Sequence, residues 1–338
     1  MAYGRVCGID LELTHRPSRD ARVSPAIETA GLRKSFGDNV AIEGLNLTVE
    51  QGDVFGLLSP NGADKTTTIR MLTTLLVPDS GAARVGGFDV SAQPSEVRQR
   101  IGYVMQRVAY RGLLTGRECV EIEAALYHLP RREIPALAEA ALAAVGMLPH
   151  ADRRWTEYSG GMQKRLDLAC GLLHSPEVLV LDEPILGLDV QSRHNVWEFV
   201  RDRRAGGATI LLATNYLDEA DRLCNKVAII DHGRVVVQGP PSELKRAVGA
   251  DVVEVSTPEP DRLRRIVETK RWVKKIVAGD MGVLHIFVGD AAVALPAVMR
   301  IGLDHGIGLE RMTYSRPSLD DVFLLHTGRD LREASVAS

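Results

Sequence analysis

The sequence lacks an apolar run long enough to cross a lipid bilayer. A membrane-spanning helix needs roughly 20 predominantly apolar residues, and the richest stretch here, residues 136–148, is Ala-rich and interrupted by Glu139. The first seven residues, Met1-Ala-Tyr-Gly-Arg-Val-Cys7, also lack the apolar core of a signal peptide. We therefore expect a chain that is neither exported nor membrane-spanning.

Cysteine is scarce, and its spacing fits neither a metal site nor a disulfide scaffold. We expect ordinary thiols in a reducing environment at the four positions Cys7, Cys119, Cys170 and Cys224.

A strong net charge is also missing. The chain has 41 Lys and Arg against 44 Asp and Glu, a net charge of -3. This balance argues against a protein that binds nucleic acid by covering phosphates, so no nucleic-acid partner is expected. With 338 residues, 45% of them hydrophobic and 25% charged, the chain is expected to be globular, with two domains or one large domain and an appendage.

Three parts follow one another along the chain. Residues 1–25 are polar and irregular, which is typical of a loose extension. Short apolar runs then alternate with helical stretches, and the runs at 54–58, 178–181 and 209–212 are of the kind buried in a parallel sheet. Residues 117–147 show only helical character, which indicates a helical insert.

The pattern changes beyond Gly249. Strand-like segments at 252–255, 283–288 and 309–314 alternate with helical stretches at 261–275 and 291–301. This alternation predicts a small α+β domain, and it carries no cluster of residues suited to catalysis.

A phosphate-binding loop is expected directly after the apolar run 54–58. Ser59-Pro-Asn-Gly-Ala-Asp64-Lys65-Thr66-Thr67 is an imperfect match to G-x-x-x-x-G-K-[ST]. In such a loop backbone N–H groups surround phosphates, the lysine meets the β/γ oxygens and the next hydroxyl holds Mg²⁺. Lys65 and Thr66 stand where this chemistry needs them, although alone the segment could be an ordinary turn before a helix.

Two further motifs follow in order. Ser159-Gly160-Gly161 lies 94 positions after Lys65 and opens a helical stretch, where N–H groups and the helix dipole favour an anion. Asp182-Glu183 follows the apolar run 178–181. There Asp182 can reach a metal ion and Glu183 can polarise water. Each motif alone is commonly a cap or a strand end, but the order and spacing make coincidence improbable.

Together these motifs resemble the ATP-binding cassette of ABC transporters over residues 27–248. Within that family, Ser159-Gly160-Gly161-Met162, the segment 217–221 (Leu-Asp-Glu-Ala-Asp) and the tail 316–324 (Arg-Pro-Ser-Leu-Asp-Asp-Val-Phe-Leu) are similar to the daunorubicin/doxorubicin-resistance type of exporter ATPase. This similarity covers nearly the whole chain apart from the first 25 residues.

The resemblance implies a role for each matching position. Glu183 would be the catalytic base, with Gln106 and Asn215 completing the catalytic set, and Thr66, Gln106 and Asp182 would hold Mg²⁺. An aromatic side chain, Phe36, would stack on the adenine of ATP. The phosphates would be bound by the phosphate loop, with Ser59, Asn61, Gly62, Ala63, Asp64, Lys65, Thr66 and Thr67, and by the turn Ser159, Gly160 and Gly161 of a second copy, here called the signature turn.

The resemblance also implies the fold, the partners and the location. We expect an α/β P-loop cassette at residues 26–247, with a mostly parallel sheet, an antiparallel β region and a helical subdomain near 107–160, followed by a small accessory domain at 248–338. The cassette would form a homodimer and drive a separate integral membrane permease that exports a drug or antibiotic-like amphiphile, at the cytoplasmic face of the plasma membrane.

The main departure from the family is Asp64, where glycine is usual. A carboxylate about 5 Å from a phosphate charge is repelled by about 3 kcal/mol at an effective dielectric of about 20, and it could also pair with Lys65. Ser59 replaces another glycine, and Asn215 replaces a histidine or glutamine. Ile185 and Val190 are changes that we expect to affect packing.

These departures leave an alternative open, in which a catalytically impaired cassette has a regulatory or assembly role. A non-transport ABC ATPase is a further alternative, but the chain contains neither a long coiled coil between its motifs nor a second phosphate loop. A Rossmann enzyme is disfavoured because the Gly-rich segment 81–87 lacks the G-x-G-x-x-G spacing.

Overall fold

The computed structural model describes residues 24–59, 62–106, 112–249, 251–279 and 282–328, so the expected extension at 1–25 lies almost entirely outside it. Its centre is a mixed sheet with strand order β10-β9-β3-β8-β7-β6, in which only β10 is antiparallel to its neighbour. The strands are β3 (Val54–Leu58), β6 (Ile101–Val104), β7 (Val178–Asp182), β8 (Thr209–Thr214), β9 (Lys226–Asp231) and β10 (Arg234–Gly239).

The strands β3, β7 and β8 of this sheet are buried on both faces, which explains their continuous apolar runs. In β8, Ile210 and Leu212 face a core built with the helices, whereas Leu211 and Ala213 face a second core shared with an antiparallel sheet of order β2-β1-β4-β5. That second sheet consists of β1 (Ile27–Phe36), β2 (Asn39–Val49), β4 (Ser80–Val85) and β5 (Phe88–Asp89).

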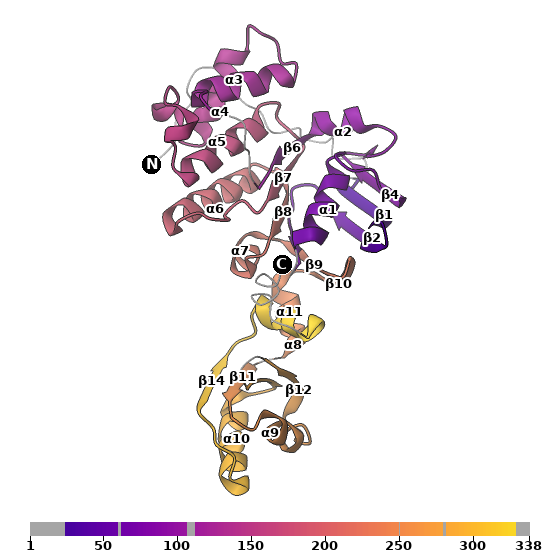
Figure 1. Cartoon of the computed structure of the whole chain (residues 1–338), viewed down its shortest axis with the longest axis vertical. Coiled ribbons are helices and arrows are strands. Elements are labelled where there is room, and N and C mark those ends of the chain that lie inside the picture. The colour runs from indigo at the N-terminus through magenta and orange to yellow at the C-terminus, as the bar shows by residue number, and fades with distance from the viewer. Residues whose placement is uncertain (1–23, 60–61, 107–111, 250, 280–281, 329–338) are drawn as a thin grey trace.

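Along the chain, helices connect many of these strands to one another (Figure 1). The predicted helical subdomain contains α3 and α4, which pack on each other and on α5. The helices of this first part are α1 (Gly62–Leu72), α2 (Pro94–Arg100), α3 (Gly116–Leu126), α4 (Ile134–Ala144), α5 (Gly160–Leu172), α6 (Val190–Ala205), α7 (Leu217–Leu223) and α8 (Pro241–Val248) with two 3-10 turns, Leu148–His150 and Trp155–Glu157.

The C-terminal part is an antiparallel sheet of order β12-β13-β11-β14. The helices α9 and α10 share a core with one of its faces, and α11 packs against α8 and α7 of the first part. Its elements are β11 (Asp251–Ser256), α9 (Pro260–Val267), β12 (Val273–Ala278), β13 (Val283–Val288), α10 (Ala291–His305), β14 (Arg311–Ser315) and α11 (Leu319–Thr327).

One predicted element is wrong. The helical stretch expected at 261–275 ends as a helix at Val267, and Val273–Ala278 is instead the edge strand β12. Lys274 and Lys275 are exposed on this strand, and charged residues on an edge strand are common because they discourage pairing with another chain.

Candidate functional site

Lys65 lies at the centre of a buried polar cluster where α1 begins after β3. Its side chain is 1% exposed, and Nζ donates to the carbonyl oxygen of Ser59 at 2.9 Å and to Oδ1 of Asn215 at 2.5 Å. Nζ also lies 3.6 Å from Oε1 of Glu183. Burial lowers the pKa of Lys65, and the charges of Glu183 and Asp182 oppose that shift.

Glu183 is held in a strained backbone conformation directly after β7. Its φ of +47° is uncommon for a residue with a side chain, and its N–H donates to the carbonyl oxygen of Ala213 at 2.9 Å. Oε2 accepts the N–H of Asn215 at 3.2 Å. Burial raises the pKa of Glu183, although the charge of Lys65 opposes the shift. These contacts hold the carboxyl next to Lys65.

Asp182 ends β7 beside this cluster and is 5% exposed. The hydroxyl of Tyr103 on β6 donates to its Oδ2 at 3.4 Å. Burial raises the pKa of Asp182, while Tyr103 and then Lys65 lower it. The structure therefore brings together Lys65, Asp182, Glu183 and Asn215, four of the residues that the sequence singled out.

Asp64 does not direct its hydrogen bond to the neighbouring lysine. Its Oδ2 accepts the N–H of Gly233, in the turn between β9 and β10, at 3.3 Å. Gly233 has a φ of +72°, and a Cβ there would collide with the backbone of Ala41, so this turn is tightly fixed. Burial raises the pKa of Asp64, and the Gly233 bond partly offsets the shift.

The remaining residues of the predicted phosphate site lie on separate elements. Phe36 is the last residue of β1 and is 50% exposed, as suits a ring that receives a base. Gln106 follows β6 and is exposed, Thr66 is half-buried and Thr67 is buried. Gly62 and Ala63 open α1, and Asn61 lies outside the described residues.

Ser159, Gly160 and Gly161 form the N-terminus of α5, in the helical part of the molecule (Figure 1). Oγ of Ser159 accepts the N–H of Met162 at 3.3 Å and caps the helix. Ser159 and Gly160 are exposed, and a Cβ added at Gly160 would meet only Leu188 at 3.9 Å. The N–H groups at an exposed helix start can receive an anion from outside the chain.

Sequence reasoning missed three contact residues of this region. Tyr103 bonds Asp182, Gly233 bonds Asp64, and Lys164 on α5 reaches the carbonyl oxygen of Met105. Tyr103 gave a usable signal, because a tyrosine within an apolar strand normally needs a hydrogen-bond partner for its hydroxyl.

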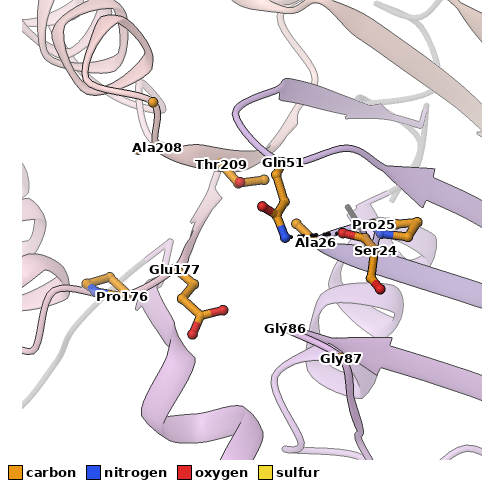
Figure 2. A pocket seen from close by; sticks show the side chains of 11 residues that line it. Ser24, Pro25, Ala26, Gln51, Gly86, Gly87, Pro176, Glu177, Ala208 and Thr209 are labelled. Carbon is orange, nitrogen blue, oxygen red and sulfur yellow. Dashed lines mark hydrogen bonds between the residues drawn. The ribbon is translucent and has the colours of Figure 1, made fainter. Parts of the chain in front are cut away.

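A cavity of about 380 Å³ lies at the opposite end of the central sheet (Figure 2). It is lined by residues at the amino ends of the strands, among them Gln51, Glu177 and Thr209, whereas the Lys65 cluster lies at their carboxyl ends. Open α/β sheets bind ligands at the carboxyl ends. The chemistry of the cluster, rather than this cavity, therefore marks the functional site.

Two family models match the chain. Residues 42–186 match "ABC transporter", and residues 239–327 match "ATP-binding protein DrrA1-3-like, C-terminal domain". The daunorubicin resistance ATP-binding protein DrrA2 of Streptomyces coeruleorubidus is 42% identical over 309 residues, which cover 90% of this chain and 95% of the relative. The chain belongs to the ABC transporter family as an ATP-binding protein.

Other similar proteins agree with this assignment. The Nod factor export ATP-binding protein I of Rhizobium sp. (strain N33) is 37% identical over 91% of this ABC ATPase and 99% of the relative. A solved ATP-binding subunit of an ABC transporter has 28% identity and a TM-score of 0.59, covering 66% of this chain and 92% of its own. The cbiO1 protein of Clostridium perfringens has 26% identity and a TM-score of 0.60, covering 73% and 96%.

The family, the fold class and ATP hydrolysis expected from the sequence are thereby confirmed. The protein is an ABC-type ATPase. No helix in the described parts of the chain is both long and apolar enough to span a membrane.

Proposed function

We propose that this ABC ATPase powers the export of a drug or antibiotic-like amphiphile through a separate integral membrane permease, at the cytoplasmic face of the plasma membrane. The names of its relatives support export, since they describe daunorubicin resistance and Nod factor export. We further propose that residues 26–247 form the cassette and residues 248–338 the accessory domain, and the family match that begins at residue 239 supports a boundary in this region.

The buried cluster of Lys65, Glu183 and Asn215 is the observation that carries the catalytic part of the proposal. The Lys65 ammonium contacts Ser59, Asn215 and Glu183, and the β- and γ-phosphates of bound ATP would take over as its partners. Glu183 would then be free to accept a proton from the attacking water. Oε1 of Glu183 is buried 3.6 Å from Nζ of Lys65, and it would be available for that water once the phosphates hold Lys65.

The donor set suits Mg²⁺ rather than a softer metal. Thr66, Gln106 and Asp182 offer oxygen ligands, and the described residues contain no group of three or more His, Cys, Asp and Glu side chains that could hold a metal alone. Mg²⁺ typically uses one or two carboxylates together with substrate phosphates. When bound it would neutralise charge on the β- and γ-phosphates.

We propose that two copies complete each ATP site. Lys65 is buried, whereas Ser159 and Gly160 are exposed at the start of α5. In a head-to-tail dimer this exposed helix start would cover the γ-phosphate bound by the other copy, because helix N-termini favour anions. The same arrangement would bring the Gln106 region near the permease.

The Glu183→Gln variant tests the catalytic assignment. The amide oxygen can still accept the Asn215 N–H, but the side chain can no longer accept a proton. We expect ATP turnover to fall by about a hundredfold or more, with the Kd for Mg-ATP within about threefold of the parent. Glu177→Gln, which changes a half-exposed carboxyl beside Arg100, is the matched control. Hydrolysis by Glu183→Gln at the parental rate would refute the assignment.

Asp64 supports a second candidate function, an impaired cassette with a regulatory or assembly role. Its buried carboxyl adds a negative charge to a loop whose ligand is a polyanion. Mg-ATP binding and hydrolysis by the purified chain separate the two functions, because an impaired cassette would bind nucleotide without turnover.

A further inference from the structure

Helix α5 and strand β6 lie side by side in opposite directions and touch at three levels. At one end Nε2 of His174, just after α5, lies 2.8 Å from the carbonyl oxygen of Ile101. In the middle, a Cβ on Gly102 would collide with the backbone of Gly171. At the other end Nζ of Lys164 donates to the carbonyl oxygen of Met105 at 3.0 Å. Helix and strand are thus fixed to each other along their length.

Lys164 is an unusual residue to find inside this contact. It is 6% exposed, and burial lowers the pKa of its ammonium. The nearby carboxyls of Asp167, Asp182, Glu183 and Glu219 oppose that shift. A buried cation costs free energy unless its charge and donors are matched, and an apolar side chain would pack here at lower cost. The lysine therefore needs a reason beyond packing.

The two ends that Lys164 joins belong to different parts of the proposed ATP machinery. Ser159 caps α5 five residues before Lys164, and its turn would contact the ATP held by the partner copy. The residue after Met105 is Gln106, which would serve the ATP of its own copy. One hydrogen bond from Lys164 spans the gap between these two segments.

We propose that Lys164 is a positioning residue that fixes the Gln106 segment to helix α5, which begins at the Ser159 turn. Through this bond Gln106, in the ATP site of its own copy, and Ser159, in the ATP site of the partner copy, move together. The proposal rests on the two-copy ATP site proposed above. It assigns to Lys164 an effect on turnover, because nucleotide binding by the Lys65 loop does not involve it.

The test compares three full-length variants. Lys164→Met removes the donor at similar length, Lys164→Arg keeps a donor and the charge, and His174→Ala loosens the same helix and strand at the end far from Gln106. We expect Lys164→Met to lower kcat for ATP about tenfold or more with KM within about threefold, and Lys164→Arg to restore kcat to within about threefold of the parent. His174→Ala should lower Tm while leaving kcat within about threefold.

Hydrogen exchange of the peptide covering residues 101–106, measured without nucleotide, reads the contact itself. We expect faster exchange in Lys164→Met and parental exchange in Lys164→Arg. If Lys164→Met does not fold, Lys164→Gln takes its place in both measurements. Parental kcat in the lysine variant, an equal loss of kcat in His174→Ala, or unchanged exchange would each overturn the proposal. A parent protein without ATP hydrolysis would instead overturn the proposed function, and the exchange result would still decide the role of Lys164.

Discussion

At the residue scale, Asp64 has two opposing effects on the phosphate loop. Its carboxylate accepts the N–H of Gly233 and so ties the start of α1 to the fixed turn between β9 and β10. The same carboxylate is a negative charge beside the place of the phosphates, where repulsion at about 5 Å amounts to about 3 kcal/mol. Burial raises its pKa, which reflects how poorly this charge is accommodated.

Replacing Asp64 separates these effects. Asp64→Asn keeps an oxygen that can accept from Gly233 but removes the charge, and Asp64→Gly removes both. We expect each to lower the Kd for Mg-ATP at least about tenfold, because the charge outweighs the single hydrogen bond. Isothermal titration measures this, with the exposed Asp38→Asn as a control for net charge. An unchanged Kd in both variants would contradict the repulsion argument.

The sequence predicted the charged centre of the site better than its supporting contacts. Lys65, Asp182 and Glu183 follow apolar runs that had to be parallel strands, and the carboxyl ends of parallel strands meet at one edge. The bonds of Lys164 to Met105 and of Asp64 to Gly233 join positions 59 and 169 apart in the chain. No local pattern marks such pairs, because only the packing of helix on strand and of turn on loop creates them.

At the element scale, helix α7 buries a carboxyl instead of an apolar side chain. Glu219 is 0% exposed, and the neighbouring side chains of Thr214 and Trp197 only partly offset the cost of burying its carboxyl. Burial raises its pKa to about 8, and the charge of Glu183 adds to the shift. At neutral pH α7 therefore packs a protonated, uncharged Glu219 against its surroundings.

This burial predicts a pH-dependent stability. Below pH 4.5 the carboxyl is protonated in the folded and unfolded chains alike, but between pH 4.5 and about 8 only the unfolded chain releases the proton. The free energy of unfolding should thus fall by about 1.4 kcal/mol per pH unit in this window. Glu219→Gln stays neutral, so its Tm relative to the parent should be about 5 °C or more higher at pH 8 than at pH 5.5.

Thermal melts of Glu219→Gln and the parent from pH 5.5 to pH 8 measure this difference in Tm. The titration of every other group affects both proteins equally and cancels in the difference. Glu198→Gln, an exposed carboxyl on the neighbouring helix α6, is the matched control and should follow the parent. Parallel Tm curves for Glu219→Gln and the parent would show that Glu219 is ionised in the folded protein.

Central elements were easier to predict than edge elements. The runs at 54–58, 178–181 and 209–212 lie within β3, β7 and β8, because strands covered on both faces must be apolar throughout. The predicted helical stretch 261–275 wrongly includes the start of the edge strand β12, since the exposed lysines of that strand interrupt the apolar pattern. Periodicity cannot distinguish a short, half-exposed strand from the end of an amphipathic helix.

At the scale of the whole molecule, the C-terminal part is joined to the first part by more than the chain connection. Val322 and Phe323 of α11 belong to the same buried core as Leu244 of α8 and Leu217 of α7, and so does Phe287 of β13. Helix α11 therefore packs between the C-terminal sheet and the first part. No local sequence pattern predicts this packing, because contacts between α11 and α7 join segments about a hundred residues apart.

The last prediction concerns the proposed dimer. Lys65→Ala should disable the phosphate loop, and Gly160→Asp should disable the signature turn by placing a carboxylate at the helix start. Gly160 has room for the new side chain, so the fold should persist. If each site combines Lys65 of one copy with Gly160 of the other, a mixed dimer of the two variants has one intact site. Random mixing of equal amounts should then restore about a quarter of parental ATPase activity, because half of the dimers are mixed and each has one of two sites.

Each variant alone must be inactive for this comparison, and Asp64 is retained in both. Mixing Lys65→Ala with Glu183→Gln is the control, since Lys65 and Glu183 lie in the same half of a site. In that mixed dimer one site lacks Lys65 and the other lacks the Glu183 carboxyl, so neither is intact. That control mixture should stay inactive. Only a shared site lets an intact loop from one chain meet an intact turn from the other. Activity in the control mixture, or no activity in the mixture of Lys65→Ala and Gly160→Asp, would therefore mean that the site is not shared between two copies in this way.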